Sequence, residues 1–255
     1  MSEILKYFQE KVVFSPVILP NHHEFDFDKN HEEYFWETPF EGKINVLHFK
    51  IENPKGVIVY FHGNSDNLHR WGNIASEFTE YQYDVLVMDY RGYGKSLGPR
   101  NEEFLYSDSQ FIYDYAKKMY GEENIIIFGR SLGGAFATKI GAENRPKSVI
   151  LEAAFYSLED IVNRWLPKKV TNRVAPTMTY HFLSYENIKK IQVPLYHFHG
   201  TKDSVVPLKS GKKLFEAFKK SQPKISKKFI EISEGGHNDL INFEEFKSEI
   251  LKILK

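Results

Sequence analysis

A serine with a glycine two positions to either side is the residue of this chain with the clearest chemical potential. Ser131 stands in the pattern Gly-x-Ser-x-Gly at residues 129–133, directly after the apolar run at 125–128. The small flanking residues leave the hydroxyl uncrowded on a strained turn between a strand and a helix. Because a hydroxyl is a weak nucleophile until a base removes its proton, a histidine must lie close to it. We therefore expect Ser131 to act as a nucleophile in acyl transfer.

A histidine and an aspartate later in the chain supply the partners that such a serine needs. His237 follows the apolar run at 228–232 and two glycines, and it is the only histidine after the last good acid candidate. Asp203 follows the run at 194–198. An aspartate that accepts the Nδ1–H of a histidine fixes its tautomer and stabilises the imidazolium. The sequence thus predicts Ser131, His237 and Asp203 as nucleophile, base and orienting acid.

Other carboxylates compete with Asp203 for the role of the acid. Glu152 lies at the end of another apolar run, and Asp160 lies beyond it. Asp239 is two residues from His237, where we expect it to point away or to cap the last helix. Asp203 is preferred because it lies on the loop directly after the strand that precedes the strand of the histidine.

Backbone N–H groups near the serine are expected to bind the oxyanion of a tetrahedral intermediate. One is the N–H of Leu132, which follows Ser131 at the start of a helix. The other belongs to the loop after the apolar run at 57–61, where Asn64 is preferred and Ser65 is the alternative. Both assignments concern the backbone, so they do not depend on the identity of the side chain.

No metal or cofactor is expected. His197 and His199 stand two residues apart on one strand, a spacing that could ligate a metal, but no third ligand is evident nearby. We expect structural roles for both. The Arg-Gly-Tyr-Gly segment at 91–94 resembles a phosphate-binding loop only superficially, because the full pattern with its terminal Lys-Ser or Lys-Thr pair is missing. A tight turn at a sheet edge is expected there.

The elements that must position these residues form a series of apolar runs and helical patterns. Several of the apolar runs lack polar alternation, which is typical of strands buried on both faces of a parallel sheet. The expected strands are 56–62, 84–90, 124–128, 148–152, 194–198 and 228–232. The expected helices are 68–81, 104–120, 132–144, 208–220 and 240–254. This alternation predicts an α/β protein whose mostly parallel sheet is covered by helices on both faces.

Two regions depart from this series. Residues 32–50 alternate polar with apolar side chains around a turn at Gly42, which predicts an antiparallel hairpin at the sheet edge. Residues 156–190 hold no clear strand and two prolines, which predicts short helices that form a small cap over the carboxyl end of the sheet. No linker or repeat divides the chain, so residues 1–255 are expected to form a single domain. Aromatic residues in and beside the cap could line an apolar acyl pocket or form the cap's own core: Phe155, Tyr156, Trp165, Phe182 and Tyr185.

Composition argues against several classes of partner. Lys plus Arg and Asp plus Glu balance at 34 each, so no overall charge favours nucleic acid or an anionic membrane. The absence of cysteine removes disulfides and thiolate chemistry and fits a reducing compartment. Neither a signal peptide nor an apolar run of the ~18 residues that span a bilayer is evident, so a soluble, cytoplasmic protein is expected. The helical spacing of Ile4, Leu5, Phe8 and Val12 leaves peripheral membrane contact open, although a helix packed on its own domain is favoured.

Five motifs, in this order, resemble those of the α/β-hydrolase superfamily. They are Phe61-His62-Gly63-Asn64, Asp89-Tyr90-Arg91-Gly92-Tyr93-Gly94-Lys95-Ser96, Gly129-Arg130-Ser131-Leu132-Gly133-Gly134, His199-Gly200-Thr201-Lys202-Asp203 and Gly235-Gly236-His237-Asn238. The strongest likeness is to the small, lid-poor α/β-hydrolase domain-containing serine hydrolases, which include protein depalmitoylases. The resemblance covers most of the chain and implies the α/β-hydrolase fold. Membrane-bound relatives carry an apolar N-terminal anchor, whereas this chain begins almost directly at the domain.

The resemblance also implies an enzyme, without a cofactor, that hydrolyses acyl esters or thioesters through an acyl-enzyme intermediate. Its substrate would be a small-molecule or lipid-like acyl compound. Because the superfamily hosts esterases, thioesterases, lipases, amidases and peptidases on one fold, the motifs do not identify the leaving group. A serine peptidase or amidase, and a non-catalytic binding protein of the same fold, are the alternatives.

Overall fold

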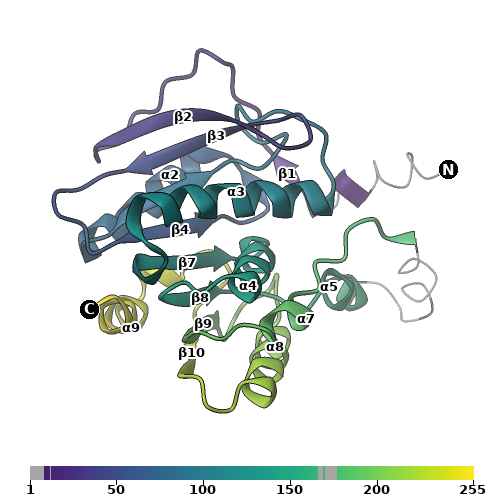
Figure 1. Cartoon of the computed structure of the whole chain (residues 1–255). Coiled ribbons are helices and arrows are strands. Elements are labelled where there is room, and N and C mark those ends of the chain that lie inside the picture. The colour runs from purple at the N-terminus through teal and green to yellow at the C-terminus, as the bar shows by residue number, and fades with distance from the viewer. Residues whose placement is uncertain (1–8, 12, 166–168, 170–176) are drawn as a thin grey trace.

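A central sheet of eight strands organises the computed structural model, which describes residues 9–11, 13–165, 169 and 177–255 (Figure 1). The strand order is β10-β9-β8-β7-β4-β6-β3-β2. Strand β3 runs antiparallel to both of its neighbours, and all other neighbouring strands are parallel. The strands are β2 (His31–Thr38), β3 (Gly42–Phe49), β4 (Val57–Phe61), β6 (Asp84–Met88), β7 (Ile125–Arg130), β8 (Ser148–Glu152), β9 (Leu195–Gly200) and β10 (Lys227–Ile232). The expected mostly parallel sheet with an edge hairpin is confirmed.

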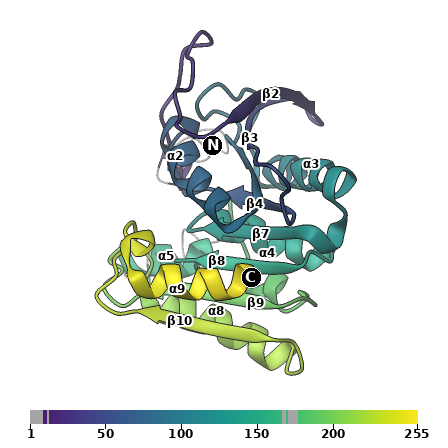
Figure 2. The same cartoon turned by 90° about the vertical axis from the view of Figure 1, so that its left-hand side faces the viewer.

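Helices cover both faces of this sheet because its central strands are apolar on both sides. In β4, Val57 and Val59 pack into one hydrophobic core, whereas Ile58 and Tyr60 pack into the other. The first core also contains side chains of α3 (Glu102–Tyr120), α4 (Gly133–Glu143) and α8 (Leu208–Ser221), and the second contains those of α2 (Leu68–Ser76) and α9 (Glu244–Leu254). Figure 2 shows α2 and α3 on opposite sides of the strands.

Two predicted helices are interrupted. The helix expected at 68–81 ends as α2 at Ser76 and continues as the 3₁₀ turn η1 (Glu77–Tyr81). The helix expected at 240–254 splits into η4 (Leu240–Asn242) and α9, because Phe243 between them is extended. Leu240 is fully buried, and Phe243 packs against the same core. Tertiary packing therefore overrides the helical pattern at this position.

The turn between β2 and β3 also differs from the expectation. The residues with positive φ are Phe40 (59°) and Glu41 (57°), whereas Gly42 is already the first residue of β3. A Cβ at Gly42 would lie 2.1 Å from Thr38 Oγ1 and 2.5 Å from Arg91 Nη2. The glycine is therefore required for close approach of the arginine rather than for the turn conformation itself.

Arg91, in the predicted turn at 91–94, is fully buried and joins this hairpin to α3. Its Nε and Nη2 donate to Asp108 at 2.7 and 2.8 Å, and its Nη1 donates to the carbonyl of Phe40 at 2.6 Å. A planar guanidinium can serve these acceptors together. The segment is thus a structural turn, and it holds the hairpin edge against the rest of the sheet.

A small parallel pair of strands and two short helices lie outside the main sheet. Strand β1 (Ser15–Pro16) pairs with β5 (Ser65–Asp66), which follows β4. Helices α5 (Leu158–Trp165) and α7 (Ser184–Ile188) belong to the predicted cap, of which residues 166–168 and 170–176 lie outside the described residues. Figure 1 shows α5 beyond the end of the sheet toward which β4 and β7 point. The predicted N-terminal helix face of Ile4, Leu5, Phe8 and Val12 also falls outside the described residues.

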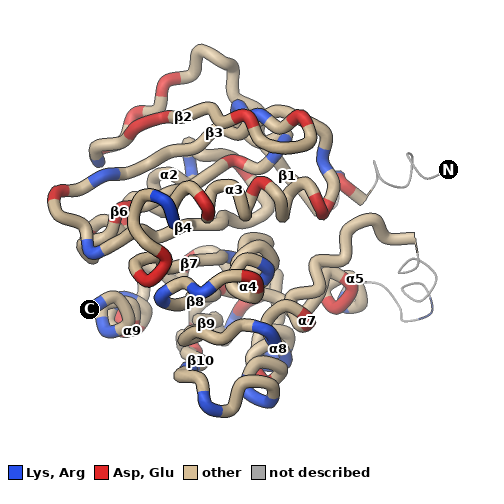
Figure 3. Tube along the Cα trace, viewed as in Figure 1, with Lys and Arg blue, Asp and Glu red and all other residues tan. Residues whose placement is uncertain are grey.

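Charged residues of both signs are interspersed along the chain. Figure 3 shows Lys and Arg alternating with Asp and Glu over the visible elements rather than gathering into one face of a single sign. Among the described helices, none has both the length and the apolar character needed to cross a membrane.

Replacing Asp108 by alanine is expected to lower the free energy of unfolding by about 3–5 kcal/mol, because it leaves the buried Arg91 without its counter-charge. Urea denaturation measures this loss. Asp114→Ala on the same helix is the matched control, since Asp114 is exposed and bonds only a neighbouring glutamine in the described chain. Equal losses of unfolding free energy in the two variants would show that the buried Arg91–Asp108 pair contributes no more to stability than an exposed aspartate.

Candidate active site

The turn between β7 and α4 holds Ser131 in a strained backbone conformation. Its φ is +53°, in the left-handed region that residues with a side chain rarely adopt. The Ser131 N–H donates to the carbonyl of Glu152 on the neighbouring strand at 2.8 Å. A Cβ at Gly133 would lie 1.9 Å from the carbonyl oxygen of Phe61, and one at Gly129 would lie 2.4 Å from the Ala137 Cβ. Both glycines are therefore required by close packing of the turn.

The three side chains predicted from the sequence meet at the carboxyl edge of the sheet. His237 Nε2 lies 3.0 Å from Ser131 Oγ, and His237 Nδ1 lies 2.8 Å from Asp203 Oδ2. They follow β7, β9 and β10, which are parallel, so their carboxyl ends reach the same edge. With the carboxylate accepting the Nδ1–H, the other ring nitrogen is free to accept the serine proton.

Asp203 is held from its other side by backbone donors. Its Oδ1 accepts the N–H groups of Val205 and Val206 at 2.9 and 2.8 Å, which leaves Oδ2 to face His237. His199 Nε2 donates to the Val206 carbonyl at 2.9 Å and lies 3.5 Å from Asp203 Oδ2. The carboxylate therefore has a fixed orientation and is almost fully buried.

The two histidines on β9 are packed inside the protein. Burial lowers the pKa of His199, and burial lowers the pKa of His197 well below its usual range. Gly211 of α8 makes room for His199, because a Cβ there would lie 2.3 Å from its Nδ1. In the described part of the chain, no three metal-ligating side chains gather around them or elsewhere. Both residues are buried structural imidazoles here.

The rival carboxylates contact other partners. Asp160 accepts the Ser210 hydroxyl at 2.6 Å and pairs with Lys213 at 2.9 Å. Glu152 pairs with Arg130, with 3.3 Å between Oε1 and Nε, and burial raises the pKa of its carboxyl while Arg130 opposes that shift. Asp239 is expected from the sequence to point away from His237 or to cap the last helix. Its side chain caps neither η4 nor α9 and instead accepts the N–H of Gly236, which braces the turn before the histidine.

The two predicted oxyanion donors line the same pocket as Ser131. Asn64 and Leu132 both belong to its lining, whereas Ser65 does not. In the described part of the chain, neither backbone N–H of this pair donates a hydrogen bond within the protein. The Asn64 carbonyl accepts from Ser15 N at 2.9 Å and from the Tyr93 hydroxyl at 2.6 Å. Both groups are therefore available to a ligand at the serine.

The N-terminal segment is the part of this site that the sequence did not indicate. Val13 lines the pocket, and its carbonyl accepts the Asn64 side-chain amide at 3.2 Å. The pairing of β1 with β5 spans only two residues in each strand: Ser15 pairs with Ser65, and Pro16 pairs with Asp66. A pairing this short has no periodic pattern, so no sequence signal could have placed it.

The pocket at Ser131 has an apolar lining and a volume of about 230 Å³. Besides Ser131, Asn64 and Leu132, the lining consists of Val13, Phe155, Leu158, Ile161, Val162, Val205 and Val206. Of the aromatic residues predicted for an acyl pocket, Phe155 is the one described in it. Tyr156 and Tyr185 stack on each other at 4.5 Å, Phe182 is buried beside Phe136, and the Trp165 side chain lies outside the described residues. Phe155 thus lines the pocket, whereas Phe182 lies in the core beside α3 and α4, and Tyr156 and Tyr185 pack against that core.

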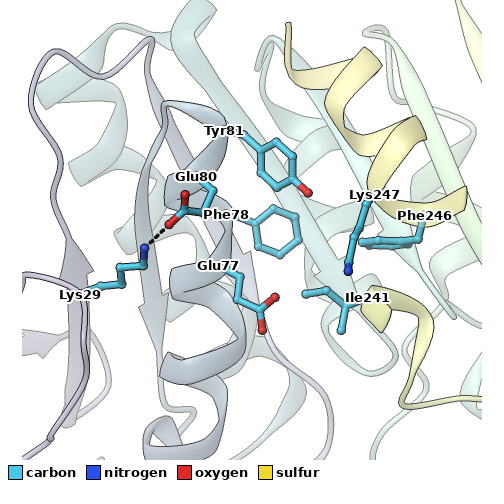
Figure 4. Close-up of a pocket in the computed structure, with 8 residues that line it drawn as sticks. All are labelled: Lys29, Glu77, Phe78, Glu80, Tyr81, Ile241, Phe246 and Lys247. Carbon is cyan, nitrogen blue, oxygen red and sulfur yellow. Dashed lines mark hydrogen bonds and ion pairs between the residues drawn. The ribbon is translucent and has the colours of Figure 1, made fainter. Parts of the chain in front are cut away.

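A second depression, drawn in Figure 4, lies between η1 and the C-terminal elements η4 and α9. It has a volume of about 170 Å³ and is lined by Lys29, Glu77, Phe78, Glu80, Tyr81, Ile241, Phe246 and Lys247. Burial raises the pKa of the Glu77 carboxyl, and Lys247 opposes that shift. Its described lining contains neither serine nor histidine, so it offers no pair of nucleophile and base.

Known proteins resemble this chain at the level of sequence. A family model described as "Serine aminopeptidase, S33" matches residues 52–185, which include Ser131 and end before Asp203. The chain is 28% identical over 229 residues to an uncharacterized protein of Acanthamoeba polyphaga mimivirus, with 83% of this chain and 76% of that protein covered. It is 29% identical over 229 residues to the lysophosphatidylserine lipase ABHD12 of Danio rerio, with 73% of this chain and 59% of the lipase covered. The chain thus spans less than two thirds of the length of that lipase.

A solved structure resembles the fold. An esterase of Pyrococcus furiosus superposes with a TM-score of 0.71 at 19% sequence identity, with 95% of this chain and 96% of the esterase covered. At this identity the likeness concerns the fold, and it extends over nearly the whole of both chains.

Gly133→Ala is expected to lower the free energy of unfolding by about 1–3 kcal/mol, because the new Cβ would be driven into the Phe61 carbonyl oxygen. Urea denaturation measures the change. Gly236→Ala is the matched control, since its Cβ would approach only the Asp239 side chain, at 3.3 Å. A Gly133→Ala protein as stable as the control would show that the turn is less tightly packed than described.

Proposed function

Because the chain belongs to the α/β-hydrolase superfamily, and within it to the family described as serine aminopeptidase S33, we propose that it is a serine hydrolase that cleaves acyl esters or thioesters. The observation that carries this proposal is the chain of hydrogen bonds from Ser131 through His237 to Asp203. A base within reach of the hydroxyl and an acid within reach of the base are the geometry that nucleophilic serine chemistry needs.

In the proposed acylation step, His237 Nε2 takes the Ser131 hydroxyl proton while Oγ bonds to the acyl carbon. The carbonyl oxygen becomes an oxyanion, which accepts hydrogen bonds from the backbone N–H groups of Leu132 and Asn64. Asp203 stabilises the imidazolium and is not itself protonated. As the tetrahedral intermediate collapses, the bond to the leaving group breaks, and the alcohol or thiol departs with the proton from His237.

Deacylation repeats the same chemistry with water. His237 takes a proton from water, the hydroxide adds to the acyl carbon, and the second intermediate forms in the same oxyanion site. Its collapse breaks the bond to Ser131 Oγ, which regains the proton from His237, and the carboxylic acid is released. Every step uses side chains and backbone groups of this chain.

The apolar pocket supports an uncharged acyl group as the part of the substrate next to Ser131. Its described lining contains no ionisable side chain. A charged acyl group would therefore lose its hydration there without gaining a partner, which is costly. The lipase relative adds single-chain lipid esters to the candidates, because one apolar pocket suits one acyl chain.

A peptidase or amidase is the second candidate, and the description of the matching family favours it. An aminopeptidase must bind a free α-ammonium group, for which a carboxylate is the usual partner. Asp160 is committed to Ser210 and Lys213, and no acidic side chain is among the described pocket lining. An acyl ester, its thioester and an aminoacyl anilide, assayed side by side, distinguish these candidates.

Ser131→Ala is expected to reduce kcat for a p-nitrophenyl ester by roughly 10³-fold or more, because members of a triad act as a unit. The same variant should lose labelling by a fluorophosphonate probe, which requires an activated serine. Ser221→Ala, at the exposed end of α8, is the control that keeps both properties. An unlabelled wild-type protein would instead favour a non-catalytic binding protein.

Ile161→Trp is expected to fill part of the acyl pocket and shift preference toward shorter acyl chains. The ratio of kcat/KM for an octanoate ester to that for a butyrate ester should fall about tenfold, as one or two lost methylene contacts imply. Asn163→Trp on the same helix is the matched control, because Asn163 lines a separate surface depression. An unchanged ratio in Ile161→Trp would place the acyl group elsewhere.

A further inference from the structure

A buried arginine directly precedes the proposed nucleophile and contacts the main chain of the proposed base, and the proposed mechanism does not use it. Arg130 is the last residue of β7 and directly precedes Ser131. Its side chain is 1% exposed, although guanidinium groups are almost never fully buried unless paired. Its interactions reach the loop of His237 and Glu152 at the end of β8, and also Tyr60 of β4 and Trp71 of α2.

The guanidinium reaches the loop that carries the base. Arg130 Nη2 donates to the carbonyl oxygen of His237 at 3.3 Å and to Asn238 Oδ1 at 3.2 Å. The carboxylate of Glu152 supplies the counter-charge, with Oε1 at 3.3 Å from Nε. The register of β7 and β8 places Glu152 directly beside Arg130. One side chain thus joins the ends of two strands to the backbone of the base.

The same guanidinium also contacts the element that supports the proposed oxyanion loop. Its central carbon lies 5.1 Å from the centre of the Trp71 ring, within cation–π range. Trp71 Nε1 donates to the Ser65 carbonyl at 2.6 Å, and its ring stacks on His62 at 5.5 Å. Arg130 is therefore in direct contact with the loop of His237, and it is connected through Trp71 to the loop that carries Asn64.

The loop of His237 is held at the turn before the histidine, and Arg130 adds a contact at the histidine itself. Gly235 and Gly236 precede the histidine, and glycine has the largest conformational freedom to lose on ordering. Lys202 N–H donates to the Gly235 carbonyl at 2.9 Å and Gly236 N–H to Asp239 Oδ1 at 2.7 Å, which holds the turn before the histidine, and Asp203 holds the imidazole at Nδ1. Arg130 binds the main chain at the carbonyl of the histidine itself. Two anchors on one residue fix both its ring and its backbone.

We propose that Arg130 is a positioning residue that holds the His237 loop against the turn of Ser131, with Glu152 as its counter-charge. The inference rests on the proposed function for its kinetic consequences, since a displaced base slows proton transfer. An arginine suits the task because its planar, multi-donor group serves the carboxylate, the carbonyl and the amide oxygen together, whereas lysine offers one compact charge.

The test compares Arg130→Met, Arg130→Lys and the double variant Arg130→Met/Glu152→Gln. The double variant removes both charges, so it avoids leaving Glu152 buried and unpaired, and it keeps the Glu152 carbonyl that holds Ser131 N. We expect it to fold and yet to lose kcat for a p-nitrophenyl ester by about 10–100-fold, because misplacing a catalytic group by about 1 Å has an effect of this size. KM should change by less than about threefold, and Arg130→Lys should be intermediate.

Hydrogen–deuterium exchange of peptides that cover residues 233–240 gives a readout independent of activity. We expect faster exchange there in the double variant than in the wild type. The control is Asp84→Asn, which perturbs a buried pair with His48 at the opposite, amino edge of the sheet and should leave kcat and this exchange unchanged.

Unchanged exchange in a folded double variant, together with a kcat within about threefold of the wild-type value, overturns the inference. It would show that Arg130 serves only to neutralise Glu152. Failure of the proposed function is distinguishable, because the wild-type protein would then neither hydrolyse the ester nor react with a fluorophosphonate. In that case the exchange comparison still decides whether Arg130 holds the loop.

Discussion

The tight turn at Ser131 is the constraint on which the rest of the site depends. Its left-handed backbone costs of the order of 1–3 kcal/mol, and it persists because the surrounding strands hold it. The Glu152 carbonyl accepts its N–H, and Gly133 packs against the Phe61 carbonyl with no room for a side chain. Because the turn places the hydroxyl at the carboxyl edge, the proposed base and acid reach it from loops that follow β10 and β9, two other parallel strands of the sheet.

The order of elements could be predicted from the sequence because buried parallel strands leave uninterrupted apolar runs, and the ends of such strands share one edge. The positions of Asp203 and His237 followed from that rule. Contacts that depend on tertiary structure could not be predicted. Gly42 must be a glycine partly because the Arg91 side chain packs against it. The partners of Arg130 lie 22 or more residues away in the sequence, so no periodic pattern indicates them.

The cap explains why aromatic content was an ambiguous signal. Tyr156 and Tyr185 stack on each other and pack against the core that contains Phe182, while the pocket itself is mainly aliphatic. Aliphatic walls distinguish substrates by volume and hydration rather than by hydrogen bonding. The same walls offer little to the charged terminus of a peptide.

The wall of the pocket contributed by Val13 belongs to the N-terminal segment, outside the main sheet. Its backbone is held through main-chain groups, as its carbonyl accepts the Asn64 amide and the following residues pair with β5. Main-chain hydrogen bonds do not depend on which side chain a residue carries. Position 13 can therefore change in size while the neighbouring loop keeps its attachment, which makes this short segment a place where substrate selectivity can diverge between homologues without redesign of the sheet.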